Sequence, residues 1–390
     1  MNYHLMIDDK FINDFIIDGE KTAPGNNIYI IDWPQEKVKH VKSDKAIFAP
    51  YGTELFLETV KNISEGDKVF IHWASDAAIN FVLKLPENIK IGLFFWGGDI
   101  VEIPYSMFKK TIYGAQSLNY FEKHEERPKV KWNLLKIKRF YKTLANRYWK
   151  YKANDQKVWE IRKAFFGRLN YFLSWNIIDH QWILEHYTTQ ASYTYFFYNF
   201  NPSEGSNITS KPSQEDRPIS LLLGNSDTVT NNHLEMLDDL ERFKGENIKL
   251  IIPLNYGNKK YGDLIEQKAV RMFGEDKVVC LRHFMNREAY YRILDEVDVA
   301  IMNHYRTQAA GNTLALLYRG KKVFINEKSS TYKFLKINDV FIGNSAKISQ
   351  LSFNEFIHPL SDDIRKKNVE NINELFKVSV KEDVLSNLLK

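Results

Sequence analysis

The stretch ISLLLGNSDTVTNNHLEMLDDLERFKGENIKLIIPL, residues 219–254, decides the fold class. It opens with an apolar strand pattern that stops at Gly224, and small polar residues follow. Apolar residues then recur at helical spacing over 233–243, and a second apolar strand pattern occupies 248–254. A strand, a helix and another strand in this order predict a parallel sheet with a crossover helix.

The alternation of strand and helix patterns continues toward the C-terminus. Further helix patterns occur at 261–274, 286–297 and 311–320, and further strand patterns at 277–281, 298–303 and 321–326. Five strands with four intervening helices make a complete doubly wound domain.

The N-terminal part predicts a second domain of this kind. Its strand patterns lie at 4–7, 27–33, 45–51, 68–74 and 89–96, with a helix pattern at 75–85. From about 104 to 200 the sequence is aromatic and predicts helices, and 201–218 is rich in Pro, Ser, Gly and Asn, as loops are. We therefore expect domains at 1–200 and 219–390, joined by a linker at 201–218 and facing a cleft.

Composition limits the class of protein. The chain has 390 residues, is 44% hydrophobic and 26% charged, and is therefore able to bury substantial cores. Cys280 is the single cysteine, so an intrachain disulfide is impossible and a reducing compartment is expected. The N-terminus lacks a secretory signal pattern, and no apolar run approaches the roughly 18 residues that a membrane span needs.

Positive charge is concentrated in one block. Residues 127–168 contain 14 Lys or Arg against two acidic residues, so the rest of the chain is net acidic. Trp, Tyr and Phe are interleaved with these cations, which predicts an interfacial helical insertion on anionic lipid. The alternative is a solvated helical hairpin whose aromatic residues pack on the domain. Nothing else in the sequence supports nucleic-acid binding by this block.

Candidate ligand contacts follow the strands, because open α/β sheets bind ligands beyond the carboxyl ends of their strands. Gly224, Asn225 and Ser226 precede a helix that begins near His233, a pattern that suits an anion. The alternative is an ordinary turn with N-capping residues. The loop is neither a Walker loop nor a GxGxxG turn.

The segment 303–313 is the second candidate. Arg306 and Gln308 follow a strand, and Gly311 opens a helix, an arrangement that suits a diphosphate. The alternative is a surface arginine. Two further strand ends carry aromatic residues, Tyr256 in the turn after Pro253 and Phe284 in a loop whose rhythm is similar to the donor half of GT-B glycosyltransferases.

In the first half, two side chains are candidates for removing a proton from an acceptor hydroxyl: His72 and Asp99. Trp96, Gly98 and Glu102 flank Asp99, and we expect them on the acceptor side, where glycines would leave room for a sugar. The alternatives are a hydrogen-bonded core histidine and a helix N-cap. No spacing of His or Cys predicts a metal site.

Taken together, these motifs resemble the bacterial TDP-N-acetylfucosamine:lipid II N-acetylfucosaminyltransferases, which complete the trisaccharide lipid of enterobacterial common antigen. The resemblance is best over 219–332 and includes Asn232-His233, the Pro253/Tyr256 turn and the strand that ends at Asn326. In the first half it rests on His72 and on Trp96 to Glu102. The basic block departs from the family pattern, which leaves the acceptor open.

The resemblance implies a GT-B glycosyltransferase at the cytoplasmic face of the inner membrane. The C-terminal domain would bind a TDP-sugar, with Arg306 neutralising the departing diphosphate, and the N-terminal domain a polyprenyl-diphosphate-linked acceptor. No metal cofactor is expected. Two alternatives remain: a non-catalytic lipid- or polyanion-binding protein on a degenerate GT-B scaffold, and a sugar-nucleotide epimerase of the same shape.

Overall fold

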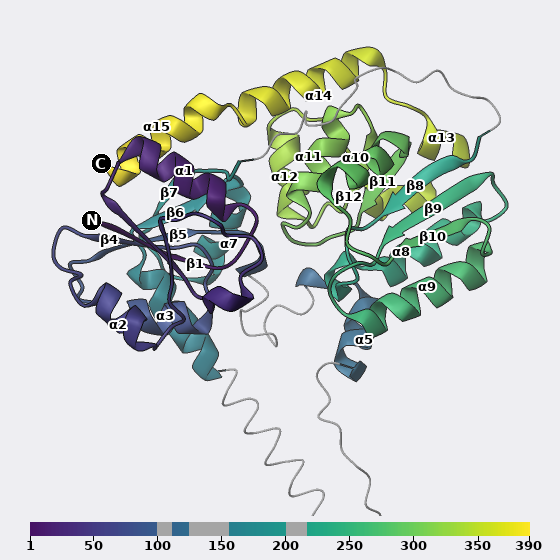
Figure 1. The fold of residues 1–390 in the computed structure, drawn as a ribbon. Helices are drawn as coiled ribbons and strands as arrows, with labels where there is room; N and C mark the ends of the chain where they lie inside the picture. Colours follow the sequence, from purple (N-terminus) through teal and green to yellow (C-terminus); the bar gives the residue numbers. More distant parts are fainter. Residues whose placement is uncertain (100–110, 125–155, 200–216) are drawn as a thin grey trace, which may run out of the picture. The chain divides into compact units, whose positions relative to one another are not determined.

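The computed structural model of the chain describes residues 1–99, 111–124, 156–199 and 217–390. Contacts divide these residues into two compact units. The first unit consists of 1–99, 156–199 and 376–390, and the second of 111–124 and 217–375. Each unit is a parallel sheet with helices packed against it (Figure 1). The predicted α/β class with two Rossmann-like sheets is confirmed.

The sheet of the first unit has, within the described residues, seven strands in the order β3-β2-β1-β4-β5-β6-β7. These strands are β1 (Asn2–Met6), β2 (Asn27–Ile31), β3 (Ala46–Phe48), β4 (Lys68–Ile71), β5 (Lys90–Phe94), β6 (Tyr171–Ser174) and β7 (Ser192–Tyr195). After β1, the chain adds β2 and β3 on one side of it. The strands β4 to β7 are then added on the other side. The carboxyl ends of the strands around this reversal form the edge where such sheets bind ligands.

Two of these strands correct the prediction that 104–200 is helical. β6 and β7 are four residues each, and they extend the sheet in parallel from β5. Periodicity alone does not separate a short apolar run from part of a buried helix, whereas pairing with a neighbouring strand and, in β6, the burial of Phe172, Leu173 and Ser174 stabilise the strand. Residues between them form the helix α7 (Ile177–His186), as predicted.

The helices of the first unit cover both faces of its sheet. Besides α7 they include α1 (Ile12–Thr22), α2 (Glu54–Val60), α3 (Asp76–Val82) and α15 (Val378–Leu389). α1 and α15 lie side by side over one face, and α2 and α3 lie on the opposite side (Figure 1). Phe15 and Ile16 of α1 share one core cluster with Leu385 and Leu389 of α15.

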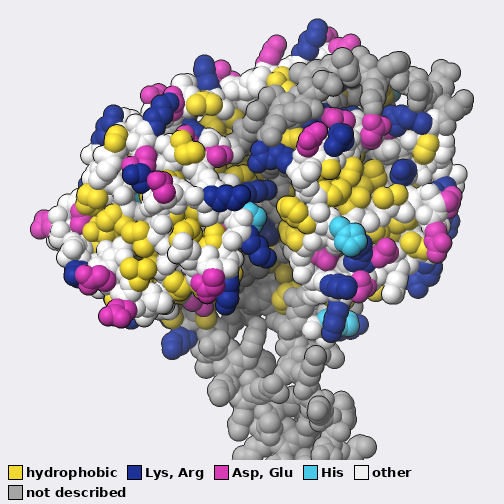
Figure 2. All heavy atoms as spheres, viewed as in Figure 1, with side chains coloured by type: hydrophobic (Ala, Val, Ile, Leu, Met, Phe, Trp, Pro, Cys, Tyr) yellow, Lys and Arg dark blue, Asp and Glu magenta, His cyan; other side chains and the backbone are white. Residues whose placement is uncertain are grey.

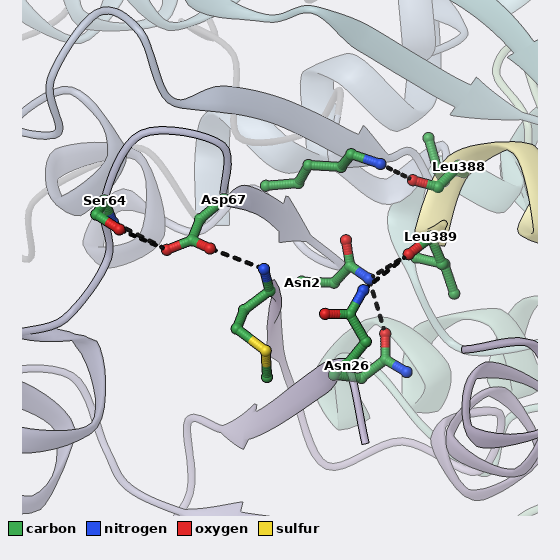
Figure 3. Close-up of polar contacts among 9 residues, drawn as sticks. Asn2, Asn26, Ser64, Asp67, Leu388 and Leu389 are labelled. Atoms are coloured by element: carbon green, nitrogen blue, oxygen red, sulfur yellow. Dashed lines mark hydrogen bonds and ion pairs between the residues drawn. The ribbon is translucent and has the colours of Figure 1, made fainter. Parts of the chain in front are cut away.

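The C-terminal helix is therefore part of the first unit, which differs from the predicted domain range 219–390. Figure 3 shows how its last carbonyl groups are bound: Asn2 Nδ2 donates to Leu389 O at 2.8 Å, and Lys68 Nζ donates to Leu388 O at 2.6 Å. Asn26 Nδ2 also donates to Leu389 O, at 3.2 Å. The final carbonyls of a helix have no intrahelical partner, so these side chains supply the missing donors.

The sheet of the second unit has, in the described part of the chain, six strands in the order β10-β9-β8-β11-β12-β13. They are β8 (Ile219–Leu223), β9 (Ile248–Pro253), β10 (Val278–Leu281), β11 (Val299–Met302), β12 (Lys322–Ile325) and the short β13 (Gly343–Asn344). The five strands predicted from the sequence are confirmed, and β13 is added at the edge.

The order of the strands requires helices on both faces, because parallel crossovers are right-handed. The main helices are α8 (His233–Leu240), α9 (Lys259–Phe273), α10 (Arg287–Glu296), α11 (Ala310–Tyr318) and α12 (Ser330–Ile337), followed by α13 (Phe353–Ile357) and α14 (Asp362–Leu375). In Figure 1, α8 and α9 lie on one side of the sheet and α10 to α12 on the other.

Helix α5 (Ala115–His124) also belongs to the second unit, although the predicted N-terminal domain included it. Glu235 of α8 accepts from Ser117 N and Ser117 Oγ at 2.8 and 2.7 Å. Gly114 N donates to Asn232 Oδ1 at 2.8 Å. These contacts attach α5 to the start of α8.

The basic block 127–168 is described only from residue 156 onward; 127–155 lie outside the described residues, as do 201–216 of the predicted linker. Residues 156–168 are helical, and Arg162, Phe165 and Phe166 are buried. Arg162 Nη1 donates to Ala74 O at 2.8 Å. This end of the block therefore packs on the first unit, as the alternative interpretation has it.

Charged and apolar side chains are interspersed on the face of the molecule that Figure 2 shows. Within the described ranges, no helix is both long and apolar enough to cross a bilayer.

Candidate active site

Strand β8 ends at Gly224, at the carboxyl edge of the sheet in the second unit. Gly224 has a φ of +71°, and a Cβ atom there would lie 2.5 Å from His233 Nε2 and 2.7 Å from Asn231 Oδ1. Glycine adopts this conformation without the penalty that other residues incur. The close packing of His233 and Asn231 therefore requires glycine at this turn.

The loop after Gly224 is closed by its own amide and hydroxyl groups. Asn225 N donates to Asn231 Oδ1 at 2.9 Å, and Asn231 Nδ2 donates to Thr228 Oγ1 at 2.8 Å. Ser226 Oγ lies 3.0 Å from Thr228 Oγ1. Asn225 and Ser226, both predicted donor contacts, thus belong to a fixed and largely buried loop, which also contains the buried carboxyl group of Asp227.

Strand β11 ends against the same loop. His304 Nε2 lies 3.1 Å from Asn225 Oδ1 and 2.8 Å from Asn231 Oδ1, so this nitrogen carries the proton. Gln308 Nε2 donates to Asn225 Oδ1 at 3.0 Å, and Gln308 Oε1 accepts from Thr230 Oγ1 at 2.8 Å. The structure thus brings Asn225 and Gln308 together, and it adds His304, whose sequence signal was its position directly after a strand.

Two histidines beneath this edge are fully buried and neutral. Burial lowers the pKa of His233 to about 3. Burial, followed by the charge of Arg306, holds the pKa of His304 well below its ordinary value. The His233 ring packs beside Gly224 and 5.8 Å from the ring of Tyr261. His233, a predicted donor contact, therefore supports the loop from below.

The segment between β11 and α11 carries Arg306, whose side chain is half-buried. The Arg306 carbonyl accepts from Ser329 Oγ at 3.1 Å. Ala309 then adopts the left-handed conformation, φ 55°, directly before α11, and Gly311 lies in the first turn of that helix. Because the free amides of a helix N-terminus favour anions, Arg306 and the start of α11 provide adjoining positive features.

Two aromatic side chains at this edge are exposed. Tyr256 is 52% exposed, and its hydroxyl accepts from Asn225 Nδ2 at 2.5 Å. Phe284, in the loop after β10, is 81% exposed. Both rings are therefore accessible for stacking on a planar group.

Two other predicted donor residues are buried. Pro253 ends β9 and pairs with Leu281 of β10. Asn326 follows β12 and donates from Nδ2 to Asn303 Oδ1 at 2.9 Å. Both residues shape the strand ends, and neither side chain is exposed.

In the first unit, the candidate base His72 is a core residue with no exposed surface. Its Nδ1 lies 2.5 Å from the Tyr198 hydroxyl and its Nε2 lies 3.2 Å from His4 Nδ1. The ring stacks on Phe94 with centroids 4.2 Å apart. Burial, with a contribution from His4, holds its pKa well below the ordinary value. The structure thus shows His72 as the hydrogen-bonded core histidine of the alternative interpretation.

Asp99, the other candidate base, is 5% exposed and joins two turns. Its Oδ1 accepts from Ala74 N at 2.8 Å, and its Oδ2 accepts from Trp96 N at 2.7 Å. The carboxylate thereby links the loop after β4 to the loop after β5. These two backbone hydrogen bonds favour the ionised form of the carboxylate and fix its orientation.

The glycine at 98 leaves room for a ring of the protein itself. A Cβ atom on Gly98 would lie 2.7 Å from Trp73 Cη2, so the indole fills the space expected for a sugar. Trp96 is half-buried and donates from Nε1 to the Tyr198 hydroxyl at 3.2 Å. Glu102 lies outside the described residues.

Asp9 is a carboxylate that the sequence analysis did not single out. It follows β1 at the same edge and is half-buried; burial raises its pKa, although Phe11 N donates to its Oδ1 at 3.1 Å. The available signal was the pair Asp8-Asp9 directly after the first strand.

A sequence profile of the family described as 4-alpha-L-fucosyltransferase, glycosyl transferase group 56, matches residues 149–345, about half of the chain. The chain belongs to this family. It is therefore a glycosyltransferase, which decides against the epimerase and the non-catalytic alternative. The matched range contains the donor-side residues from Gly224 to Asn326 and excludes His72 and Asp99.

Solved structures of other proteins share the fold. Sucrose-phosphate synthase from Thermosynechococcus elongatus is 10% identical, with a TM-score of 0.62 over 100% of this chain and 98% of its own. The trehalose-6-phosphate protein of E. coli bound with UDP-2-fluoro glucose is 12% identical, with a TM-score of 0.56 over 99% and 97%. WaaG, a glycosyltransferase involved in lipopolysaccharide biosynthesis, is 11% identical, with a TM-score of 0.55 over 100% and 98%. These likenesses show that this family member has the GT-B fold.

Among the residues that the structure describes, no group of three or more His, Cys, Asp or Glu is arranged to hold a metal ion.

Proposed function

We propose that the second unit binds a TDP-linked deoxyamino sugar of the N-acetylfucosamine type, and that the enzyme transfers this sugar to an oligosaccharide on undecaprenyl diphosphate. The observation that carries the donor part is the hydrogen bond from Gln308 to Asn225. It lies at the edge of the sheet that also carries Arg306 and the N-terminus of α11. Neutral amides and hydroxyls suit sugar hydroxyl and acetamido groups, whereas an arginine and a helix N-terminus suit a diphosphate.

Arg306 has the central role in this proposal. Negative charge develops on the diphosphate as the sugar leaves, and a fixed cation in place before the reaction stabilises it. Tyr256 and Phe284 would stack on the nucleotide base, which agrees with their exposure at the same edge. The buried His233, Pro253 and Asn326 would hold the strand ends in position. We propose no metal ion for this step.

The acceptor side of the proposal rests on the family resemblance. It names a lipid-linked oligosaccharide of enterobacterial common antigen and a peripheral location at the cytoplasmic face of the inner membrane. Residues 127–155, the part of the basic block outside the described residues, would contact anionic lipid. No nucleic acid partner is proposed. Sedimentation with vesicles of anionic phospholipid tests this contact, and a protein lacking 127–155 should then remain in the supernatant.

Calorimetric titration with TDP, UDP and GDP tests the donor assignment. We expect TDP to bind and Arg306→Ala to lose that binding, with turnover reduced by about 10²-fold or more. Arg292→Ala is the matched control, because Arg292 is a 71% exposed arginine on α10 of the same unit. The affinity of Arg292→Ala for TDP should equal that of the unmodified protein.

Each outcome has a distinct meaning. Preference for UDP would support the donor site but refute the assignment of TDP as its nucleotide. Normal turnover in Arg306→Ala would remove Arg306 from the leaving-group role. No binding of any nucleotide to the unmodified protein would refute the donor site altogether.

A further inference from the structure

Three half-buried aromatic rings line the carboxyl edge of the sheet in the first unit. Phe11, Trp73 and Trp96 follow β1, β4 and β5, which are neighbours in the sheet. The ring centroids of Phe11 and Trp96 are 5.8 Å apart, and those of Trp73 and Trp96 are 6.3 Å apart. We call these three residues the aromatic row. Such rings at a ligand edge provide apolar faces on which a sugar ring can pack.

Four lysines follow the neighbouring strands β1 and β2 at the same edge of the sheet. Lys37, Lys39 and Lys42 are exposed in the loop between β2 and β3, and Lys10 is exposed after β1. We call 37–42 the cationic loop. Lys10 Nζ lies 4.9 Å from the centroid of the Phe11 ring, which connects the cations to the aromatic row. No side chain in the described ranges forms an ion pair with any of these four lysines.

The cationic loop is held in place by the segment that carries Lys10 and Phe11. Asp8 accepts from the three consecutive amides of Lys39, His40 and Val41 at 2.7, 3.0 and 2.9 Å. Asn13 Oδ1 accepts from Lys42 N at 2.8 Å.

Val41 anchors the centre of the loop, since it is 2% exposed and belongs to the core cluster. The loop backbone is therefore ordered before a ligand arrives, which reduces the entropy lost on binding. The Asp8 carboxylate accepts three backbone amides, so it competes little for the lysines.

We propose that the cationic loop and Lys10 bind the diphosphate of a lipid-linked acceptor, and that the aromatic row packs against the sugar next to it. The acceptor chemistry rests on the proposed function. The aromatic row favours a prenyl-diphosphate saccharide over a bilayer surface, because its rings are half-buried at the ligand edge of the sheet. Ammonium groups on a fixed loop form charge-assisted hydrogen bonds to phosphate oxygens.

The test uses the full-length protein and farnesyl diphosphate, a water-soluble prenyl diphosphate. Saturating TDP is present so that diphosphate binding in the second unit is blocked, and tryptophan fluorescence reports occupancy near Trp73 and Trp96. The double variant Lys39→Ala/Lys42→Ala should weaken farnesyl diphosphate binding by about tenfold or more, since it removes two charge-assisted contacts.

The control is Lys84→Ala/Lys90→Ala, two exposed lysines at the opposite, amino-terminal edge of the same sheet. It should bind farnesyl diphosphate as the unmodified protein does, and both double variants should retain their affinity for TDP. If TDP does not bind to the unmodified protein, the proposed donor site is refuted. The comparison of the two double variants still tests the acceptor site, because both variants carry the same second unit.

Two results would overturn the acceptor site. The first is equal affinity for farnesyl diphosphate in the unmodified protein and in Lys39→Ala/Lys42→Ala. The second comes from vesicles of anionic phospholipid without any prenyl diphosphate: if the variant loses vesicle binding but keeps farnesyl diphosphate binding, the loop contacts lipid headgroups instead.

Discussion

The carboxyl edges of the two sheets use different chemistry, although both sheets are parallel and doubly wound. At the edge of the second unit, Asn225, Gln308 and His304 form one network of neutral donors and acceptors, with Arg306 beside it. At the edge of the first unit, His72 and Asp99 are occupied by internal hydrogen bonds, and the exposed groups are lysines beside aromatic rings.

Backbone conformation separates the two edges as well. Among the described residues, three non-glycine residues have positive φ, and two of them, Asn232 and Ala309, lie in loops of the second unit's ligand edge. Strained residues persist where surrounding contacts determine the backbone, and they concentrate at functional sites. The comparison suggests one edge shaped for a single small ligand and another that presents fixed cations and rings to a larger one.

The largest effect is expected at Gly224. Gly224→Val would force a β-branched residue into a left-handed conformation and against His233 Nε2. We expect TDP affinity to fall by about tenfold or more, because the αL penalty alone is about 1–2 kcal/mol. Calorimetry measures this. Gly245→Ala is the control, since a Cβ atom there meets nothing within 4 Å. Unchanged affinity in Gly224→Val would mean that the donor loop tolerates rearrangement.

A substitution of Asp99 tests the carboxyl edge of the sheet in the first unit. Asp99→Asn places an amide nitrogen against one of two backbone donors, Ala74 N or Trp96 N, and should lower the free energy of unfolding by about 1–3 kcal/mol. Denaturant unfolding measures the loss, and turnover of the folded fraction should change only a few-fold. A loss of turnover by orders of magnitude at unchanged stability would restore Asp99 as the base and break the comparison.

Acid should destabilise both units, because each contains buried histidines whose pKa burial lowers: His4, His72 and His180 in the first, His233 and His304 in the second. Their folded pKa values lie below the ordinary 6.5, so the unfolded chain binds more protons and stability falls as pH drops below 6.5. Each histidine contributes up to about 1.4 kcal/mol per pH unit.

Unfolding at pH 7.5 and 5.5 would measure this dependence. The variant His4→Gln should lose less stability between these pH values than the unmodified protein, whereas His358→Gln, which changes an exposed histidine, should lose as much as the unmodified protein does. Equal losses in both variants would contradict the assignment of neutral buried rings.

The smallest effect is expected at Ala309. Ala309→Gly removes the left-handed penalty but adds entropy to the unfolded chain, so a net gain of about 0.5–1 kcal/mol is expected. Thermal unfolding measures it, with Ala346→Gly, an exposed position of ordinary φ, as the control that should lose stability. A loss in both variants would mean that Ala309 is not strained.

The regular elements of the second unit were predictable from the sequence. Its strands are short apolar runs bounded by glycine or polar turns, and helices such as α8 and α9 have one apolar stripe, so the two periods separate. β6 and β7 were missed because their residues, YFLS and SYTY, lie in an aromatic stretch that continues into the neighbouring helices, so no change of period marks them. The buried end of the basic block was detectable, because Arg162, Phe165 and Phe166 recur at helical spacing.

The candidate site was only partly predictable. The prediction that Asn225 and Gln308 lie at one edge of the sheet is correct, because both residues follow strands and the carboxyl ends of parallel strands meet at the same edge. A position after a strand did not show whether the side chain there is accessible or buried. His72, Asp99 and Asn326 also follow strands, and all three are buried. Which side chains fill a turn depends on neighbours from distant segments, as Trp73 does over Gly98.

The sequence by itself determined the two parallel sheets, the edge of each that can bind ligands and the residue types available there, because periodicity and turn chemistry are local. Only the tertiary structure decided which of these residues are exposed. It also attached α15 to the first unit and α5 to the second, because such packing depends on surfaces far apart in the chain. Burial, which lowers the pKa of His72, His233 and His304, is a property of that packing alone.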